Sequence, residues 1–191
     1  LTGKKSHTPP FIRNAFFHML DILSKVDSEN DFESAREKIK TILQENAKNL
    51  VTRRIPVQDL SFNVMINNSP DKYGKKIANS NVRSSSIDAS SVIGKDPHKG
   101  LPQHIKAARL LVEKGREIKA GGIISYVKTR TVESVKPVEL VKPEEIDTDK
   151  YLETMEVTFD QILASLNFNF KSLVGQPRQS NLDELFWGGS V

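Results

Sequence analysis

Residues 8–23 read TPPFIRNAFFHMLDIL and predict an amphipathic helix near the start of the chain. Thr8 followed by Pro9 and Pro10 is a helix start signal, because a capping hydroxyl and an early proline both suit a helix N-terminus. The apolar residues that follow recur at the spacing of one helix face: Phe11, Ile12, Ala15, Phe16, Met19, Leu20 and Leu23.

A second helix is predicted from about Asp31 to Leu50, after a polar turn at residues 27–31. Its charged residues lie opposite an apolar stripe, which consists of Phe32, Ala35, Ile39, Ile42, Leu43, Ala47 and Leu50. Two adjacent amphipathic helices joined by a short turn are typical of an antiparallel helical hairpin.

The middle of the chain has a weaker pattern. Apolar residues alternate over residues 60–66, which fits either a short strand or an extended helix end, and residues 67–70 form a loop. Residues 75–100 are rich in Ser, Asn, Gly and Lys and poor in large apolar residues. This composition predicts a flexible surface insertion.

Helices and strands return after the insertion. A third helix is expected to open at Pro102 and end near Gly115, with Ile105, Ala108, Leu111 and Val112 inward. A strand is predicted over residues 123–127, and residues 138–141 are a candidate partner for it. The last helix, residues 147–166, buries Tyr151, Leu152, Met155, Phe159, Ile162, Leu163 and Leu166. The predicted fold is therefore α+β and mainly α: a helical hairpin and further helices with a small β-sheet.

Composition limits the function classes. The 191 residues suffice for one domain with a modest core plus a tail, and the net charge of +4 comes mostly from bases within residues 1–130. Residues 139–160 are acidic, so a polyanion would meet the first two thirds of the chain. The absence of cysteine excludes disulfides and thiolate chemistry and fits an intracellular protein. No apolar run is long enough to predict a membrane span, and Leu1 in place of Met suggests a piece of a longer protein.

Catalytic motifs are missing from the sequence. The histidines show no metal-ligand spacing, and neither a phosphate-binding Gly-rich loop nor a Gly-x-Ser-x-Gly elbow occurs. The paired acids Glu144–Glu145 and Asp147–Asp149 are interpreted as a solvated helix entry, and His104 as a first-turn helix residue. The pattern favours a binding element over an enzyme site.

An ordered series of short motifs carries a family resemblance. It comprises Pro56-x-x-Asp59-Leu60, Ser69-Pro70-Asp71-Lys72-Tyr73, Pro102-Gln103-His104-Ile105, residues 107–111 (AARLL), residues 115–127 (GREIKAGGIISYV), residues 137–140 (PVEL) and Asp147-x-Asp149-Lys150-Tyr151. In order and spacing the series resembles the thumb of archaeal family B DNA polymerases, the crenarchaeal branch above all, over about residues 1–170. The sequence departs from that pattern at Gly122, where the family usually has Asp, and in the long segment 75–100.

The resemblance implies a thumb domain over residues 1–170 and a C-terminal tail over residues 171–191. A thumb grips primer–template duplex across the minor groove and keeps the primer end at a palm that lies elsewhere. Because the palm, finger and exonuclease motifs are absent here, no catalytic residue is carried over. No cofactor is expected in this segment, and Mg²⁺ belongs to the palm. The implied partners are double-stranded DNA, a sliding clamp and the remaining polymerase domains, in the cytoplasm on chromosomal DNA and not at a membrane.

The expected DNA contacts follow from the resemblance and from phosphate chemistry. A grip that ignores base sequence uses Lys, Arg, amide groups and helix N-termini. The candidates are Lys4, Lys5, Asn67, Asn68, Lys75, Lys76, Pro102, His104 and Lys119. Tyr73 and Tyr126 are expected to pack rather than to stack on bases. The alternative for each lysine is an ordinary solvated surface position.

The tail resembles a clamp-binding box, Gln-x-x-aliphatic-x-x-aromatic-aromatic. Its members here are Gln179, Leu182, Leu185, Phe186 and Trp187, with Leu185 standing where an aromatic residue is usual. The alternative is an apolar segment that folds back on its own domain. For the whole chain, three other functions stay open: a stand-alone nucleic-acid-binding accessory subunit, the smaller half of a split polymerase, and a purely structural interaction protein.

Overall fold

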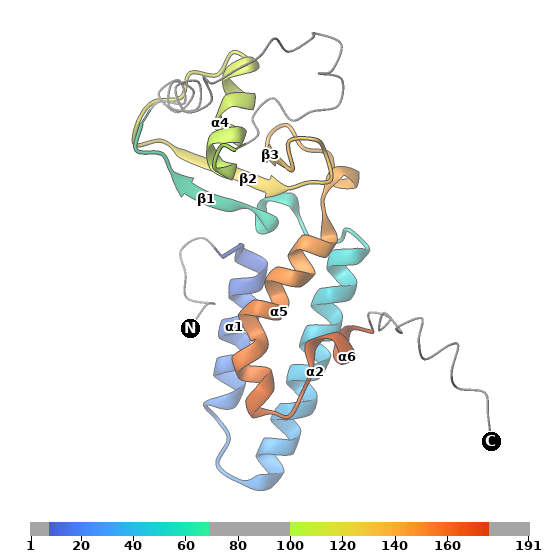
Figure 1. Cartoon of the computed structure of the whole chain (residues 1–191). Coiled ribbons are helices and arrows are strands. Elements are labelled where there is room, and N and C mark those ends of the chain that lie inside the picture. Colours follow the sequence, from blue (N-terminus) through green and yellow to red (C-terminus); the bar gives the residue numbers. More distant parts are fainter. Residues whose placement is uncertain (1–7, 69–99, 176–191) are drawn as a thin grey trace, which may run out of the picture.

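The computed structural model describes residues 8–68 and 100–175, arranged as a helical part and a sheet part (Figure 1). The helical part contains α1 (Pro10–Leu23), α2 (Glu29–Val51), α5 (Thr148–Ser165) and the short α6 (Phe170–Val174). The sheet part contains β1 (Phe62–Met65), β2 (Ile123–Lys128), β3 (Val135–Pro137) and α4 (Gln103–Glu113), with 3₁₀ turns η2 (Val57–Leu60) and η4 (Pro143–Glu145). The mainly helical α+β class is confirmed. The predicted insertion, up to residue 99, and the tail box lie outside the described residues.

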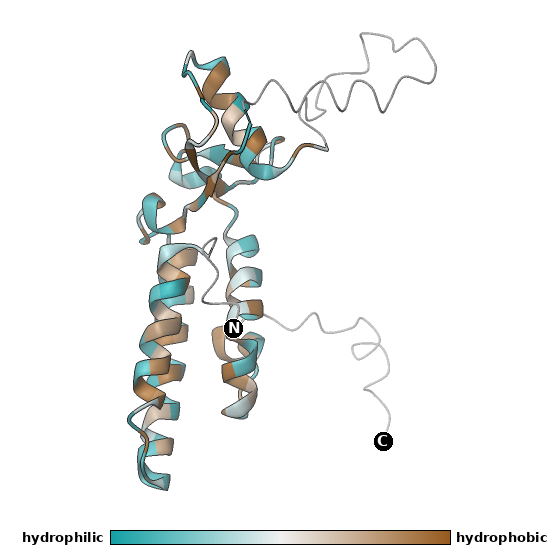
Figure 2. Ribbon diagram, turned by 90° about the vertical axis from the view of Figure 1, so that its left-hand side faces the viewer, coloured by the Kyte–Doolittle hydropathy of each residue, from teal (hydrophilic) through white to brown (hydrophobic). Residues whose placement is uncertain are grey.

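The helical hairpin forms as the apolar spacing predicts. The hydroxyl of Ser28 caps α2 by accepting a hydrogen bond from the backbone N–H of Asp31 at 3.2 Å. Helix α5 lies along α1 and α2, and Phe159 stacks on Phe16 with ring centroids 6.5 Å apart. Hydrophobic and hydrophilic segments alternate along these helices in Figure 2, as amphipathic helices require.

The sheet is antiparallel throughout, in the order β1-β2-β3. Phe62 pairs with Tyr126, which pairs in turn with Pro137, so residues 62–65 form a strand rather than a helix end. Helix α4 packs on β2 and β3 and covers one face. Because Phe62 and Val64 point to that covered side, the alternation in the sequence correctly separates the two faces.

Three local predictions were wrong or incomplete. The strand that pairs with β2 is residues 135–137 and not 138–141. The Val138 N–H adds one hydrogen bond to the Ser125 carbonyl, and the chain then turns away, because the Leu140 N–H donates to the Pro137 carbonyl. Val112, which was expected to be buried, is 40% exposed. The sheet covers only one face of α4, and Ala107, not Val112, lies on that buried face. Helix α6 was not predicted, since it is only 5 residues long.

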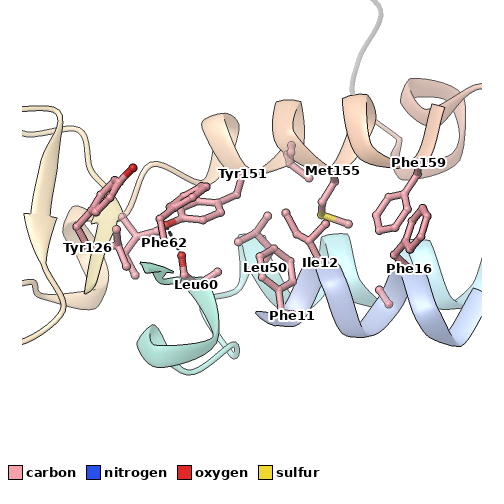
Figure 3. Close-up of a cluster of buried hydrophobic side chains, with 14 of the residues drawn as sticks. Phe11, Ile12, Phe16, Leu50, Leu60, Phe62, Tyr126, Tyr151, Met155 and Phe159 are labelled. Atoms are coloured by element: carbon pink, nitrogen blue, oxygen red, sulfur yellow. Dashed lines mark hydrogen bonds between the residues drawn. The ribbon is translucent and has the colours of Figure 1, made fainter. Parts of the chain in front are cut away.

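Tyr151 joins the two parts of the fold. Its hydroxyl donates to the Leu60 carbonyl at 2.8 Å and accepts from the Lys128 backbone N–H at 3.1 Å. The side chain is fully buried, and burial raises the pKa of its phenol. Figure 3 shows Tyr151 between the sheet residues Phe62 and Tyr126 and the helix residues that continue the core.

Replacing Tyr151 by Phe is expected to lower the free energy of unfolding by about 2–4 kcal/mol, because the buried carbonyl of Leu60 and the partly buried N–H of Lys128 both lose this partner. Urea unfolding followed by circular dichroism measures the change. Tyr126→Phe is the matched control: that hydroxyl makes one long bond to Gln103, at 3.4 Å. A similar decrease in the free energy of unfolding for both variants would show that the hydroxyl of Tyr151 does not stabilise the contact between the helical part and the sheet part.

Candidate nucleic-acid interface

Asn67 and Asn68 lie at the end of the sheet where β1 stops. Ile66 extends the β1–β2 ladder by one step: its N–H donates to the Gly122 carbonyl at 2.9 Å, and its carbonyl accepts from the Gly121 N–H at 2.7 Å. This pair fixes the two asparagines, both exposed, beside the Gly121–Gly122 turn. Gly121 has φ +84, a conformation that residues with a side chain rarely adopt.

Lys119 belongs to the same turn. Its carbonyl accepts a hydrogen bond from the Gly122 N–H at 3.1 Å. Its Nζ lies 3.4 Å from Oε1 of Glu117, and the two side chains are 78% and 79% exposed. An ion pair so open to water is weak, so the ammonium group can exchange Glu117 for a phosphate at little cost. The structure therefore brings Asn67, Asn68 and Lys119 together at one end of the sheet.

The turn is also where the sequence departs from the family pattern. A Cβ added at Gly122 would lie 3.1 Å from the Lys119 carbonyl oxygen, which is tighter than usual. Glycine at this position therefore keeps the turn compact and adds no second carboxylate to that of Glu117, which already lies beside the ammonium group of Lys119. The absence of a further negative charge at this turn favours the binding of a polyanion.

Pro102 and His104 form a second group, at the N-terminus of α4. Pro102 occupies the N-cap position of this 11-residue helix, and no side chain caps it. The neighbouring Gln103 accepts the long bond from Tyr126, in the second half of β2, whereas Asn67 and Asn68 lie beyond its first residue. The predicted contacts that the structure describes thus fall into two groups near opposite ends of β2. Lys4, Lys5, Lys75 and Lys76 lie outside the described residues.

The sheet face opposite α4 is open where β1 pairs with the first residues of β2, whereas Val127 farther along the same face is fully buried. The sequence-based choice of DNA-binding residues missed this open part. Met65 and Ile123 pair across β1 and β2 and are 60% and 70% exposed. Beside them the Ser125 hydroxyl donates to the side-chain oxygen of Asn63. The signal was present in the alternation of residues 62–66, whose odd-numbered members face outward.

The acidic residues serve local structure. Asp147 caps α5 by accepting from the Lys150 N–H at 3.3 Å, which confirms the helix-entry interpretation. Glu145 accepts from the Lys136 ammonium group at 2.6 Å and from the Lys142 N–H at 2.9 Å, and these bonds lower the pKa of its carboxyl. Within residues 8–68 and 100–175, no cluster of His, Asp or Glu could hold a metal ion.

Lys128 is a structural cation rather than a candidate for DNA binding. Its Nζ lies 5.1 Å from the centroid of the Phe62 ring and donates to the hydroxyl of Thr154 at 3.3 Å. Burial lowers the pKa of this ammonium group. Tyr126 packs against Phe62 with ring centroids 5.5 Å apart, so its predicted packing role is confirmed.

Comparison with known proteins gives a consistent answer. No family model matches the chain. It is 30% identical over 170 residues to DNA polymerase 1 of Saccharolobus solfataricus, covering 89% of this chain and 17% of that protein. DNA polymerase 1 of Aeropyrum pernix is 28% identical over 175 residues, covering 92% and 16%. The family B DNA polymerase of Pyrobaculum calidifontis shares the fold, with a TM-score of 0.55 and 18% identity over 78% of this chain and 17% of that one.

The fold and these similarities define the class of the chain: it is related to one part of the archaeal family B DNA polymerases. More particularly, its sequence relatives are crenarchaeal DNA polymerase 1 proteins, and the resemblance found in the motifs is confirmed. The chain spans about a sixth of their length. In the part that the structure describes, none of the helices is both long and apolar enough to cross a membrane.

Proposed function

We propose that this chain is the thumb of a family B DNA polymerase and holds primer–template duplex without reading its sequence. The observation that carries the proposal is the gathering of Asn67, Asn68 and Lys119 at one end of the sheet. Duplex DNA carries one charge per ~1.7 Å of its axis, and amides and ammonium groups are suitable partners for phosphate and sugar oxygens.

The sheet part is the DNA-contacting part of this thumb. Both groups of candidate residues belong to it, and its open face adds the amide of Asn63 and the apolar side chains of Met65 and Ile123. Amides and apolar groups together suit the minor groove, which presents acceptors between sugar walls. The helical part supports the sheet through the joint at Tyr151.

The remaining proposals concern the larger protein. Residues 1–170 are the thumb, and residues 171–191 are a tail that docks on a sliding clamp through Gln179, Leu182, Leu185, Phe186 and Trp187. The whole protein is a DNA-directed DNA polymerase whose palm, fingers and exonuclease complete the enzyme in the cytoplasm, on chromosomal DNA. Mg²⁺ acts at carboxylates of the palm.

The purified chain is expected to show no nucleotide incorporation on primed template with Mg²⁺, since its sequence contains none of the palm motifs whose carboxylates hold the catalytic metal ions. A primer-extension assay measures the incorporation. The control is the same assay with a complete family B polymerase added. Incorporation that copurifies with the chain through several columns would overturn its assignment as a thumb.

A further inference from the structure

A groove opens between α2, α5 and α6, on the helical part, and none of the candidate DNA contacts that the structure describes lines it. Its volume is about 700 Å³, within the range of pockets that bind ligands or peptide side chains. Apolar residues contributed by three helices line it, and polar groups stand among them: Ala47, Val51, Leu152 and Val174, with Gln44, Lys48 and Asp149. Val51 is 52% exposed, although it lies among these apolar neighbours.

Helix α6 forms one wall of this groove and is firmly placed. Asn169 caps it by accepting from the Ser172 N–H at 3.2 Å, and Gln44 of α2 donates to the Leu173 carbonyl at 3.0 Å. Gly175 follows at φ +65, a left-handed residue that ends the helix and redirects the chain. Gly175 lines the groove itself, so the segment that follows α6 and leads to residues 182–187 starts at the groove wall.

The tail carries large apolar side chains that can fill this groove. Residues 182–187 (LDELFW) place four large apolar side chains within reach, because seven residues from Gly175 to Leu182 can span up to ~25 Å. Asp183 and Glu184 lie between these anchors and complement the ammonium group of Lys48, whereas the carboxylate of Asp149 in the same lining is already paired with Arg130 at 2.8 Å. A tethered segment meets its groove at an effective concentration of about millimolar, so weak contacts are enough to hold it.

We propose that residues 182–187 occupy the α2–α5–α6 groove when no clamp is present, and that clamp and groove compete for the same side chains. The competition rests on the clamp docking proposed above, whereas the occupancy of the groove does not. If the tail is docked about four fifths of the time, the apparent clamp affinity falls about fivefold. The polymerase would thereby keep its apolar tail covered until a clamp takes it.

Occupancy is tested with a spin label, which the absence of cysteine makes specific. A nitroxide attached at Ser190→Cys in the full chain is expected to broaden the methyl NMR signals of Val51 and Val174 and to spare Ile105 in α4. Val51→Asp is expected to abolish the broadening of the Val174 signals by placing a charge against Asp183 and Glu184. Val157→Asp is the control, because Val157 is an exposed valine, at 65%, outside the groove.

Competition is tested by calorimetry of a crenarchaeal sliding clamp against the full chain and both variants, with melting curves to confirm folding. Val51→Asp is expected to raise clamp affinity about fivefold, and Val157→Asp to leave it unchanged. Unbroadened Val51 and Val174 signals in the labelled chain would overturn the inference, even if the clamp binds. Broadening of these signals without any clamp affinity would leave the groove proposal standing and refute the clamp proposal instead. Equal clamp affinity of all three chains, with the label effect present, would refute the competition.

Discussion

Replacing Leu182 and Phe186 together by Ala abolishes clamp binding and leaves duplex binding intact: this is the expected result for a tail that carries the docking box. Each large apolar side chain contributes ~1.5–3 kcal/mol when fully buried, before ordering costs. Truncating both lowers the affinity at least about a hundredfold, since every 1.4 kcal/mol is about tenfold. None of the proposed DNA contacts lies in residues 171–191, so the salt-dependent affinity for duplex is unaffected.

Calorimetry of a synthetic peptide of residues 179–191 against the clamp measures the contribution of the box directly. The peptide has no groove to leave, so it is expected to bind at least as tightly as the full chain. Asn181→Ala is the control, because that position is variable in the box pattern. Failure of the peptide to bind at high micromolar concentration, with unchanged clamp affinity of the double mutant, would place the docking surface elsewhere on the chain.

The helices could be predicted because their signals are local. The apolar spacing of residues 11–23 and of residues 151–166 corresponds to helices that do form, and most of those apolar residues are buried. Helix spacing depends only on residues a few positions apart. The second strand that pairs with β2 was located less accurately than the helices, because strand pairing joins residues that are distant in sequence. The apolar pattern of residues 138–141 competed with that of residues 135–137, which form the strand.

The candidate interface could be predicted from the sequence only in part, because it too depends on contacts between residues that are distant in sequence. Asn67 and Lys119 are far apart in sequence, and only the backbone pair between Ile66 and the Gly121–Gly122 turn brings them together. The groove beside Val51 required three helices, one of which was not predicted. Residue types indicated the chemistry, whereas tertiary packing decided which of them became neighbours.

Duplex affinity is expected to fall steeply with salt, and this is the second large effect. A grip on about four phosphates gives a slope of log K against log salt of roughly −3.6. Between 50 mM and 200 mM salt the affinity would then drop about 150-fold, without preference for any sequence. Charge reversal at Lys119, or at Lys4 and Lys5, is expected to remove contacts with phosphates. The slope then becomes shallower by ~0.9 for each phosphate contact that is lost.

The most direct measurement of the central claim is this salt titration, by fluorescence anisotropy of a labelled duplex, on the chain and on two matched variants. Lys119→Glu changes a lysine of the proposed interface, and Lys171→Glu makes the same charge change on α6, where that lysine pairs with Glu156 at 3.5 Å. The thumb account predicts a shallower slope and weaker binding for Lys119→Glu and an unchanged slope for Lys171→Glu. A flat salt response of the unaltered chain, or an equal decrease in affinity for the two variants, would contradict it.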